Sequence, residues 1–147
     1  MAGHSAGAYN AMMVALADSV YTDQGEAMPG IAGVIGLAGP YDFLPEKWPE
    51  TRAAFKGTTE LESTQPINYL NSESPPLLLI TGVDDIRVDP KHSKTMNKLA
   101  DERGANAEFH LYQDIGHAKL LLSLAKPFRD WAPTLEHIDA FIARYSQ

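Results

Sequence analysis

Ser5 stands at the centre of Gly3-His4-Ser5-Ala6-Gly7, which has the pattern G-x-S-x-G. This pattern is typical of a sharp turn between a strand and a helix that exposes a nucleophilic serine. On its own it is a weak signal, because a glycine-rich helix start with a capping serine has the same form. The small residues after Ser5 strengthen it, since they open a segment with helical periodicity and leave room for a close strand-to-helix crossing. The sequence therefore predicts Ser5 as a nucleophile.

A nucleophilic serine needs a base, and the base needs a carboxylate that orients it. The segment Thr81-Gly-Val-Asp-Asp-Ile-Arg-Val88 follows a predicted buried strand, and its acid is either Asp84 or Asp85. The segment Asp114-Ile-Gly-His117 follows the last predicted strand and supplies an imidazole. Functional loops of open α/β sheets lie at the carboxyl ends of the strands, so we expect these groups to meet Ser5 at one edge.

The other histidines are predicted to have surface or structural roles. His4 lies inside the serine turn, where its side chain should point away from the attacking oxygen. His110 belongs to a predicted strand, whereas His92 and His137 lie in predicted helices with solvated faces. Histidine pairs at metal-binding spacing are absent from the sequence, which therefore predicts no metal site.

Strands and helices must alternate to position these residues. Continuous apolar runs predict buried strands over 31–38 and 76–81, and an alternating run predicts a strand nearer an edge over 107–113. Asp89-Pro90 and Gly104 delimit a predicted helix over about 90–103.

Apolar spacing of three and four predicts two further helices. One covers about 6–19, and the other is C-terminal, with an apolar face formed by Trp131, Leu135, Ile138, Ile142 and Tyr145. Prolines interrupt 40–75, where we expect only short helices around 46–55 and 66–70. The alternation predicts a single α/β domain with a parallel sheet of about three strands flanked by helices.

Composition excludes several classes of function. The 147 residues suffice for about one domain, and the hydrophobic and charged fractions of 44% and 21% are ordinary for a globular protein. Twelve basic against nineteen acidic residues give a net charge of −7, which disfavours nucleic acid as a partner. The absence of cysteine excludes disulfides and a thiol nucleophile. With no membrane-spanning run and no signal peptide before the serine motif, we expect a cytoplasmic protein.

Several segments, in this order, resemble one family. GHSAGAYNAMM, GVIGLAGPYDFLP, TQPINYL, PPLLLITGVDDIRV and DIGHAKLLLSLAKPF are similar to the carboxylesterase branch of the α/β-hydrolase superfamily, which includes hormone-sensitive-lipase-like esterases. The resemblance covers almost the whole chain. It implies an esterase without a cofactor, acting on a small-molecule ester, with Ser5 as nucleophile and His117 as general base. The family pattern, counted from Gly82 to Val88, places the acid on Asp85, while Asp89 is better explained as a helix cap.

The resemblance also suggests where substrate would bind. The backbone N–H of Ala6 would be one donor of the oxyanion hole. Segment 40–71 lies where such enzymes build part of a substrate pocket, and Tyr41, Phe43 and Trp48, with Leu44, are candidates to line it. The alternative is that these side chains only pack the loop onto the core.

Members of this family carry a further half-domain before the serine turn, including the strand that feeds it and a loop that supplies a second oxyanion donor. We therefore expect the sheet to lack a strand beside Ser5, and we expect the chain to self-associate through that edge or to pair with a missing N-terminal half. Two functions of different class follow: a serine esterase, or a catalytically silent fragment that acts as a structural or interaction unit. The same triad would also serve a peptidase, an amidase or a thioesterase.

Overall fold

The structure, a computed structural model, describes residues 1–23, 25, 30–44 and 49–145. Within these residues one parallel sheet has the strand order β1-β2-β3-β4. The strands are β1 (Ala2–His4), β2 (Val34–Leu37), β3 (Leu77–Gly82) and β4 (Ala107–Tyr112). The predicted α/β architecture is confirmed, and the described sheet has four strands where about three were predicted.

The additional strand, β1, leads directly into the serine turn, so the expectation that the feeding strand is missing was wrong. It pairs in parallel with β2, with Ala2 beside Ile35 and His4 beside Leu37. The pairing continues one residue further, because the Ser5 N–H donates to the Leu37 carbonyl over 2.9 Å. Three residues are too few to show a strand periodicity, which is why the sequence pattern missed this element.

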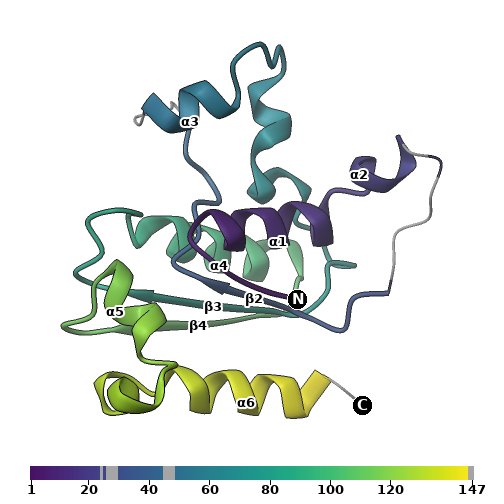
Figure 1. The fold of residues 1–147 in the computed structure, drawn as a ribbon. Coiled ribbons are helices and arrows are strands. Elements are labelled where there is room, and N and C mark those ends of the chain that lie inside the picture. Colours follow the sequence, from purple (N-terminus) through teal and green to yellow (C-terminus); the bar gives the residue numbers. More distant parts are fainter. Residues whose placement is uncertain (24, 26–29, 45–48, 146–147) are drawn as a thin grey trace.

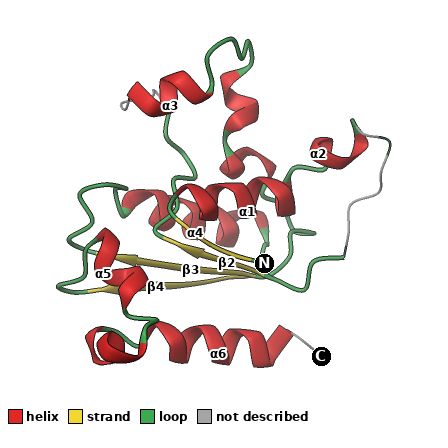
Figure 2. Ribbon diagram, viewed as in Figure 1, coloured by secondary structure: helices red, strands yellow, loops and turns green. Residues whose placement is uncertain are grey.

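Helices cover both faces of the sheet, as Figures 1 and 2 show. Helices α1 (Ala6–Leu16) and α4 (Lys91–Arg103) lie on one face, and α5 (His117–Leu122) and α6 (Thr134–Tyr145) on the other. Alternate residues of β3 serve the two sides: Leu77 and Leu79 pack with α1 and α4, whereas Leu78 and Ile80 pack with α5 and α6. This double burial explains why β3 is apolar at successive positions.

Several boundaries differ from those predicted. Helix α1 ends at Leu16, because Ala17 is extended (φ −91°, ψ 99°), and a short helix α2 (Ser19–Thr22) follows. Helix α4 ends as predicted at Gly104, which is left-handed with φ 72°. Trp131 does not belong to the C-terminal helix: it ends a separate 3-10 helix, η3 (Lys126–Trp131), and α6 begins at Thr134 after a proline. Helix α5 was not predicted.

The proline-rich segment contains only short elements, as expected. They are α3 (Pro49–Ala54), η1 (Leu61–Thr64) and η2 (Pro66–Tyr69). Figure 1 shows α3 standing away from the sheet, beyond α1. Helix α3 therefore projects above the face that α1 and α4 cover, whereas Tyr41, Ile67 and Leu70 of the same segment are buried in the core on that face.

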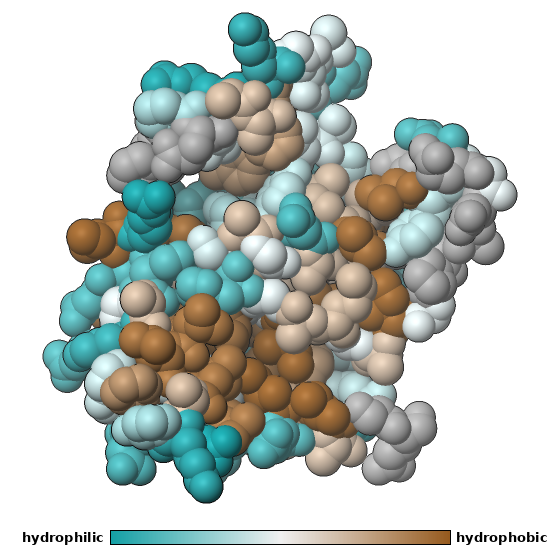
Figure 3. All heavy atoms as spheres, in the orientation of Figure 1, coloured by the Kyte–Doolittle hydropathy of each residue, from teal (hydrophilic) through white to brown (hydrophobic). Residues whose placement is uncertain are grey.

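Hydrophobic side chains gather in the lower half of the face shown in Figure 3. Exposed large apolar residues include Met1 before β1, Leu121 and Leu122 of α5, and Ile142 of α6. Self-association stays a prediction. Among the described helices, none has the length and apolar character required to cross a membrane.

Candidate active site

The serine turn has the strained geometry of a nucleophile elbow. Ser5 adopts φ 54° and ψ −124°, which is unusual for a residue with a side chain. Gly3 permits the tight crossing, because a Cβ at that position would overlap the backbone carbonyl of Gly7. With its N–H bonded to Leu37, Ser5 is fixed between the end of β1 and the start of α1. Such a turn holds the serine at the carboxyl edge of the sheet.

Asp85, rather than Asp84, is directed into the site. Its side chain is fully buried, whereas Asp84 is exposed. One carboxylate oxygen, Oδ1, accepts the backbone N–H groups of Arg87 and Val88, each over 2.9 Å. The loop therefore holds the carboxylate rigidly and leaves Oδ2 for another partner.

That partner is His117. Its Nδ1 lies 2.7 Å from Asp85 Oδ2, and since a carboxylate accepts, Nδ1–H is the donor. Backbone hydrogen bonds join the two loops. The Val83 N–H donates to the Tyr112 carbonyl over 2.8 Å, and the Asp84 N–H donates to the Ile115 carbonyl over 3.1 Å. The acid and the imidazole thus belong to one rigid unit after β3 and β4.

Ser5 reaches the same edge from β1. Its neighbour His4 contacts His117 directly, with ring centroids 4.5 Å apart. Among the hydrogen bonds of the described residues, none joins Ser5 Oγ to the His117 ring. Catalytic hydrogen bonds are often long in an unliganded site and tighten when substrate binds. The structure therefore brings together an oriented imidazole and a strained serine turn.

A cavity of about 1070 Å³ opens beside these residues and is lined by Ser5, Ala6 and Asp85, among others. Ala6 is the first residue of α1, where backbone N–H groups have no acceptor within the helix. Its N–H is thus available to a negatively charged oxygen formed at the serine. The described chain places one such donor next to the nucleophile.

Three aromatic rings form one wall of this cavity, and we call them the aromatic wall: Tyr9 of α1, Phe43 and Phe55. Phe43 and Phe55 stack with centroids 5.5 Å apart, and Tyr9 meets their edges at 5.7 and 5.9 Å. Of the residues predicted to line a substrate pocket, Phe43 and Leu44 line the cavity. Trp48 lies outside the described residues.

Tyr41 lies elsewhere. It is fully buried in the core between α1 and the sheet, where its ring fills the space that Gly36 and Gly39 leave open. Burial raises the pKa of its hydroxyl well above the usual range. Tyr41 therefore packs the loop onto the core, which is the alternative that the sequence left open, and it does not reach the cavity.

The remaining histidines have distinct settings. His92 is buried at the cavity wall, where its Nδ1 accepts the Asp42 N–H over 3.4 Å, and burial lowers its pKa. His110 and His137 stack on each other between β4 and α6, with centroids 3.6 Å apart. The role of His4 was missed, because its contact with His117 joins positions 113 residues apart.

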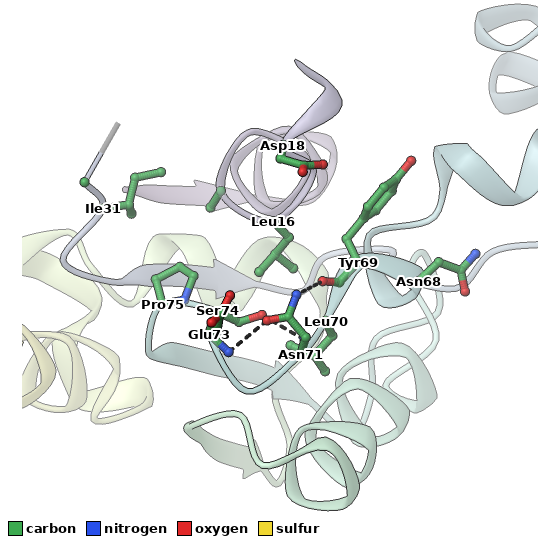
Figure 4. A pocket seen from close by; sticks show the side chains of 12 residues that line it. Leu16, Asp18, Ile31, Asn68, Tyr69, Leu70, Asn71, Glu73, Ser74 and Pro75 are labelled. Carbon is green, nitrogen blue, oxygen red and sulfur yellow. Dashed lines mark hydrogen bonds between the residues drawn. The ribbon is translucent and has the colours of Figure 1, made fainter. Parts of the chain in front are cut away.

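Two other features of the described residues carry no catalytic group. The described residues contain no group of three or more histidine, aspartate or glutamate side chains placed to hold a metal ion. A second cavity, of about 680 Å³, lies at the far end of α1 beside Leu16 and Asp18 (Figure 4). Its polar groups bond to one another: Asn71 N–H donates to Ser74 Oγ, and Glu73 N–H donates to Asn71 Oδ1. None of the predicted site residues lines it.

Comparison with known proteins places this chain in a family. The model of the prolyl oligopeptidase family matches residues 1–147. The chain belongs to the prolyl oligopeptidase family. None of the curated proteins with which it was compared matches it significantly. The predicted membership of the α/β hydrolases is thereby confirmed, whereas the esterase branch within them is not decided by this match.

Solved structures of esterases share the fold of this family member. It is similar to a truncated carbohydrate esterase from gut microbiota (16% identity, TM-score 0.71), covering 99% of this chain and 59% of the other. It is also similar to a propionate-bound esterase, Est2, of the planctomycete Thermogutta terrifontis (17% identity, TM-score 0.76), covering 97% of this chain and 54% of the other. The chain thus spans little more than half of the structures that it matches. At these identities the likeness establishes the α/β fold.

Proposed function

We propose that the protein is a serine hydrolase that cleaves carboxylic esters through Ser5, His117 and Asp85. The observation that carries this proposal is the buried Asp85 carboxylate, which holds His117 Nδ1 at 2.7 Å beside the strained serine turn. A carboxylate in this position fixes the imidazole tautomer and leaves Nε2 to accept a proton. Few purely structural roles require a buried carboxylate, an imidazole and a strained serine turn at one sheet edge.

The reaction would follow the acyl-enzyme route. Ser5 Oγ bonds to the ester carbonyl carbon as His117 Nε2 takes its proton, and the Ala6 N–H stabilises the negatively charged oxygen. His117 then returns the proton to the departing alcohol, and the carbon–oxygen bond to that alcohol breaks. Water, deprotonated by His117, releases the acid and restores Ser5.

The aromatic wall supports an apolar group on the substrate. Tyr9, Phe43 and Phe55 line the cavity that holds Ser5, so an acyl chain or ring would exchange water for aromatic surface there. We expect esters of apolar or aromatic acids to be better substrates than acetate esters.

Hydrolysis of p-nitrophenyl acetate, butyrate and benzoate by the protein and its Ser5→Ala variant tests the proposal. We expect turnover that Ser5→Ala abolishes and a higher kcat/KM for butyrate or benzoate. Phe55→Ala should remove that preference and leave acetate turnover unchanged, and Phe128→Ala, an aromatic deletion in η3, is the matched control. Turnover that survives Ser5→Ala would overturn the proposal.

The family match favours a second candidate, cleavage of peptides, because the matching family is named after an oligopeptidase. The same residues would serve, with an amine in place of the alcohol as leaving group. Peptide p-nitroanilides, assayed beside the esters, separate the two. Turnover of esters alone supports the esterase, and comparable turnover of short peptides supports the peptidase.

A further inference from the structure

His4 joins the serine turn to the loop that carries the base. Its Nε2 lies 3.1 Å from the backbone carbonyl of His117. A carbonyl oxygen can only accept, so Nε2 carries the proton and donates it. This hydrogen bond connects the residue before Ser5 to the residue that must receive the serine proton.

The His4 ring also packs against the His117 ring, at a centroid distance of 4.5 Å and an interplanar angle of 44°. The titratable groups that act on His4 are His117 and Asp85. Burial, followed by the charge of His117, lowers the pKa of His4. A neutral His4 with its proton on Nε2 can donate to the carbonyl without repelling the imidazolium that His117 becomes during catalysis.

His117 thus has two attachments of different kind. Asp85 holds its ring at Nδ1 and so joins it to the loop after β3, but this bond does not connect His117 to the serine turn. The His4 bond fixes the backbone of the same residue to the serine turn itself. Small misplacements of a catalytic group have large effects on rate, so a bond that links base to nucleophile carries weight beyond its own strength.

We propose that His4 is a positioning residue, whose Nε2–H holds the His117 carbonyl and keeps the imidazole in reach of Ser5. The inference rests on the proposed hydrolase function for its kinetic consequences. Its structural claim, that His4 restrains His117, stands separately.

Three substitutions separate the donor from the ring. Gln in His4→Gln places an N–H donor near the position of Nε2 without an aromatic ring, His4→Phe keeps a ring without a donor, and His4→Ala has neither. We expect His4→Gln to retain kcat within about threefold, and His4→Phe and His4→Ala to lose about 10- to 100-fold in kcat with KM little changed. Wild-type kcat in His4→Phe would overturn the proposal.

A second measurement does not depend on activity. The low-field proton resonance of His117 Nδ1–H, bonded to Asp85, reports how firmly the imidazole is held. We expect its exchange with water to be faster in His4→Phe than in His4→Gln, and equal rates would overturn the proposal. Thermal unfolding of each variant checks that the fold is retained.

The two proposals fail in distinguishable ways. A wild-type protein that hydrolyses no ester or peptide removes the proposed function, and the exchange rates then decide the role of His4. An active wild-type protein whose His4→Phe variant is equally active removes the role of His4 alone.

Discussion

Two pairs of histidines in contact occupy opposite parts of the sheet, and they differ in their partners. The site pair, His4 and His117, lies at the carboxyl edge with ring centroids 4.5 Å apart. The β4–α6 pair, His110 and His137, stacks almost in parallel at 3.6 Å and 7°. The closer stacking belongs to the pair between β4 and α6, not to the pair that adjoins Ser5. Ring proximity therefore does not identify the catalytic imidazole.

The two histidine pairs differ in the carboxylates that bond to them, which are Asp85 and Glu108. Asp85 has a fully buried side chain, and its Oδ2 accepts the Nδ1–H of His117. Glu108, with a side chain 28% exposed, bonds both His110 at 2.8 Å and Arg144 at 2.9 Å. Arg144 neutralises the Glu108 carboxylate that it shares with His110, so Glu108 links β4 to α6. Asp85 instead orients the His117 imidazole.

Replacement of the imidazoles should produce the largest contrast. His117→Ala removes the proposed general base, and we expect kcat to fall by about 10⁶-fold, as when a serine hydrolase loses its histidine. His137→Ala should leave kcat within about twofold, because its ring contacts β4 and not the cavity. Steady-state kinetics on p-nitrophenyl butyrate measures both. Equal losses of kcat in His117→Ala and His137→Ala would contradict the distinction between the two histidine pairs.

Replacement of the carboxylates should give a smaller contrast of the same sign. Asp85→Asn keeps the shape but no longer fixes the tautomer, and we expect a loss of about 10⁴-fold in kcat. Glu108→Gln is the matched control and should change kcat less than twofold. A similar activity for Asp85→Asn and the wild-type protein would show that the buried carboxylate is only structural.

The pH dependence of stability should sharpen the comparison further. Burial, and then the neighbouring His110, lowers the pKa of His137. The unfolded chain therefore binds this proton more tightly than the folded one, so the free energy of unfolding falls as pH drops below about 6.5. His137→Gln should make that decrease shallower in urea titrations between pH 8 and 5. Lys98→Gln on the exposed face of α4 is the control, and an unchanged slope in His137→Gln would contradict the assignment.

The smallest expected effect concerns Arg144. Burial by itself would raise the pKa of Glu108, but hydrogen bonds from His110 and Arg144 outweigh it and lower that pKa. The Arg144 side chain is 56% exposed, so we expect Arg144→Gln to lower the free energy of unfolding only slightly, and by a smaller amount at high salt. Urea unfolding at two ionic strengths measures this. A large, salt-independent loss of stability in Arg144→Gln would show that this ion pair is buried and would contradict the structure.

Local patterns predicted much of this molecule. Continuous apolar residues marked β2 and β3 because both strands are buried on two faces. Asp89 and Gly104 marked the ends of α4: Gly104 is its C-cap, whereas the N-cap is Pro90 and Asp89 Oδ1 accepts the Lys91 N–H. Strand β1 is too short to have a period. The contrast between Tyr41 in the core and Phe43 in the cavity depends on loop backbone direction, which residue types do not specify.

The sequence predicted only part of the candidate site. Loops after parallel strands share one edge, which is why Ser5, Asp85 and His117 were expected together. The contact of His4 with His117 depends on how the serine turn packs against the start of α5. The residue pattern of neither segment predicts this packing.

Reaction with a fluorophosphonate tests the central claim most directly, because this reagent requires an activated serine but no particular ester. Peptide mass mapping should locate one adduct on Ser5 in the wild-type protein and in Glu108→Gln. Labelling should be lost in His117→Ala and strongly slowed in Asp85→Asn. A folded wild-type protein that acquires no adduct, or equal labelling of Ser5 in His117→Ala, would contradict the account.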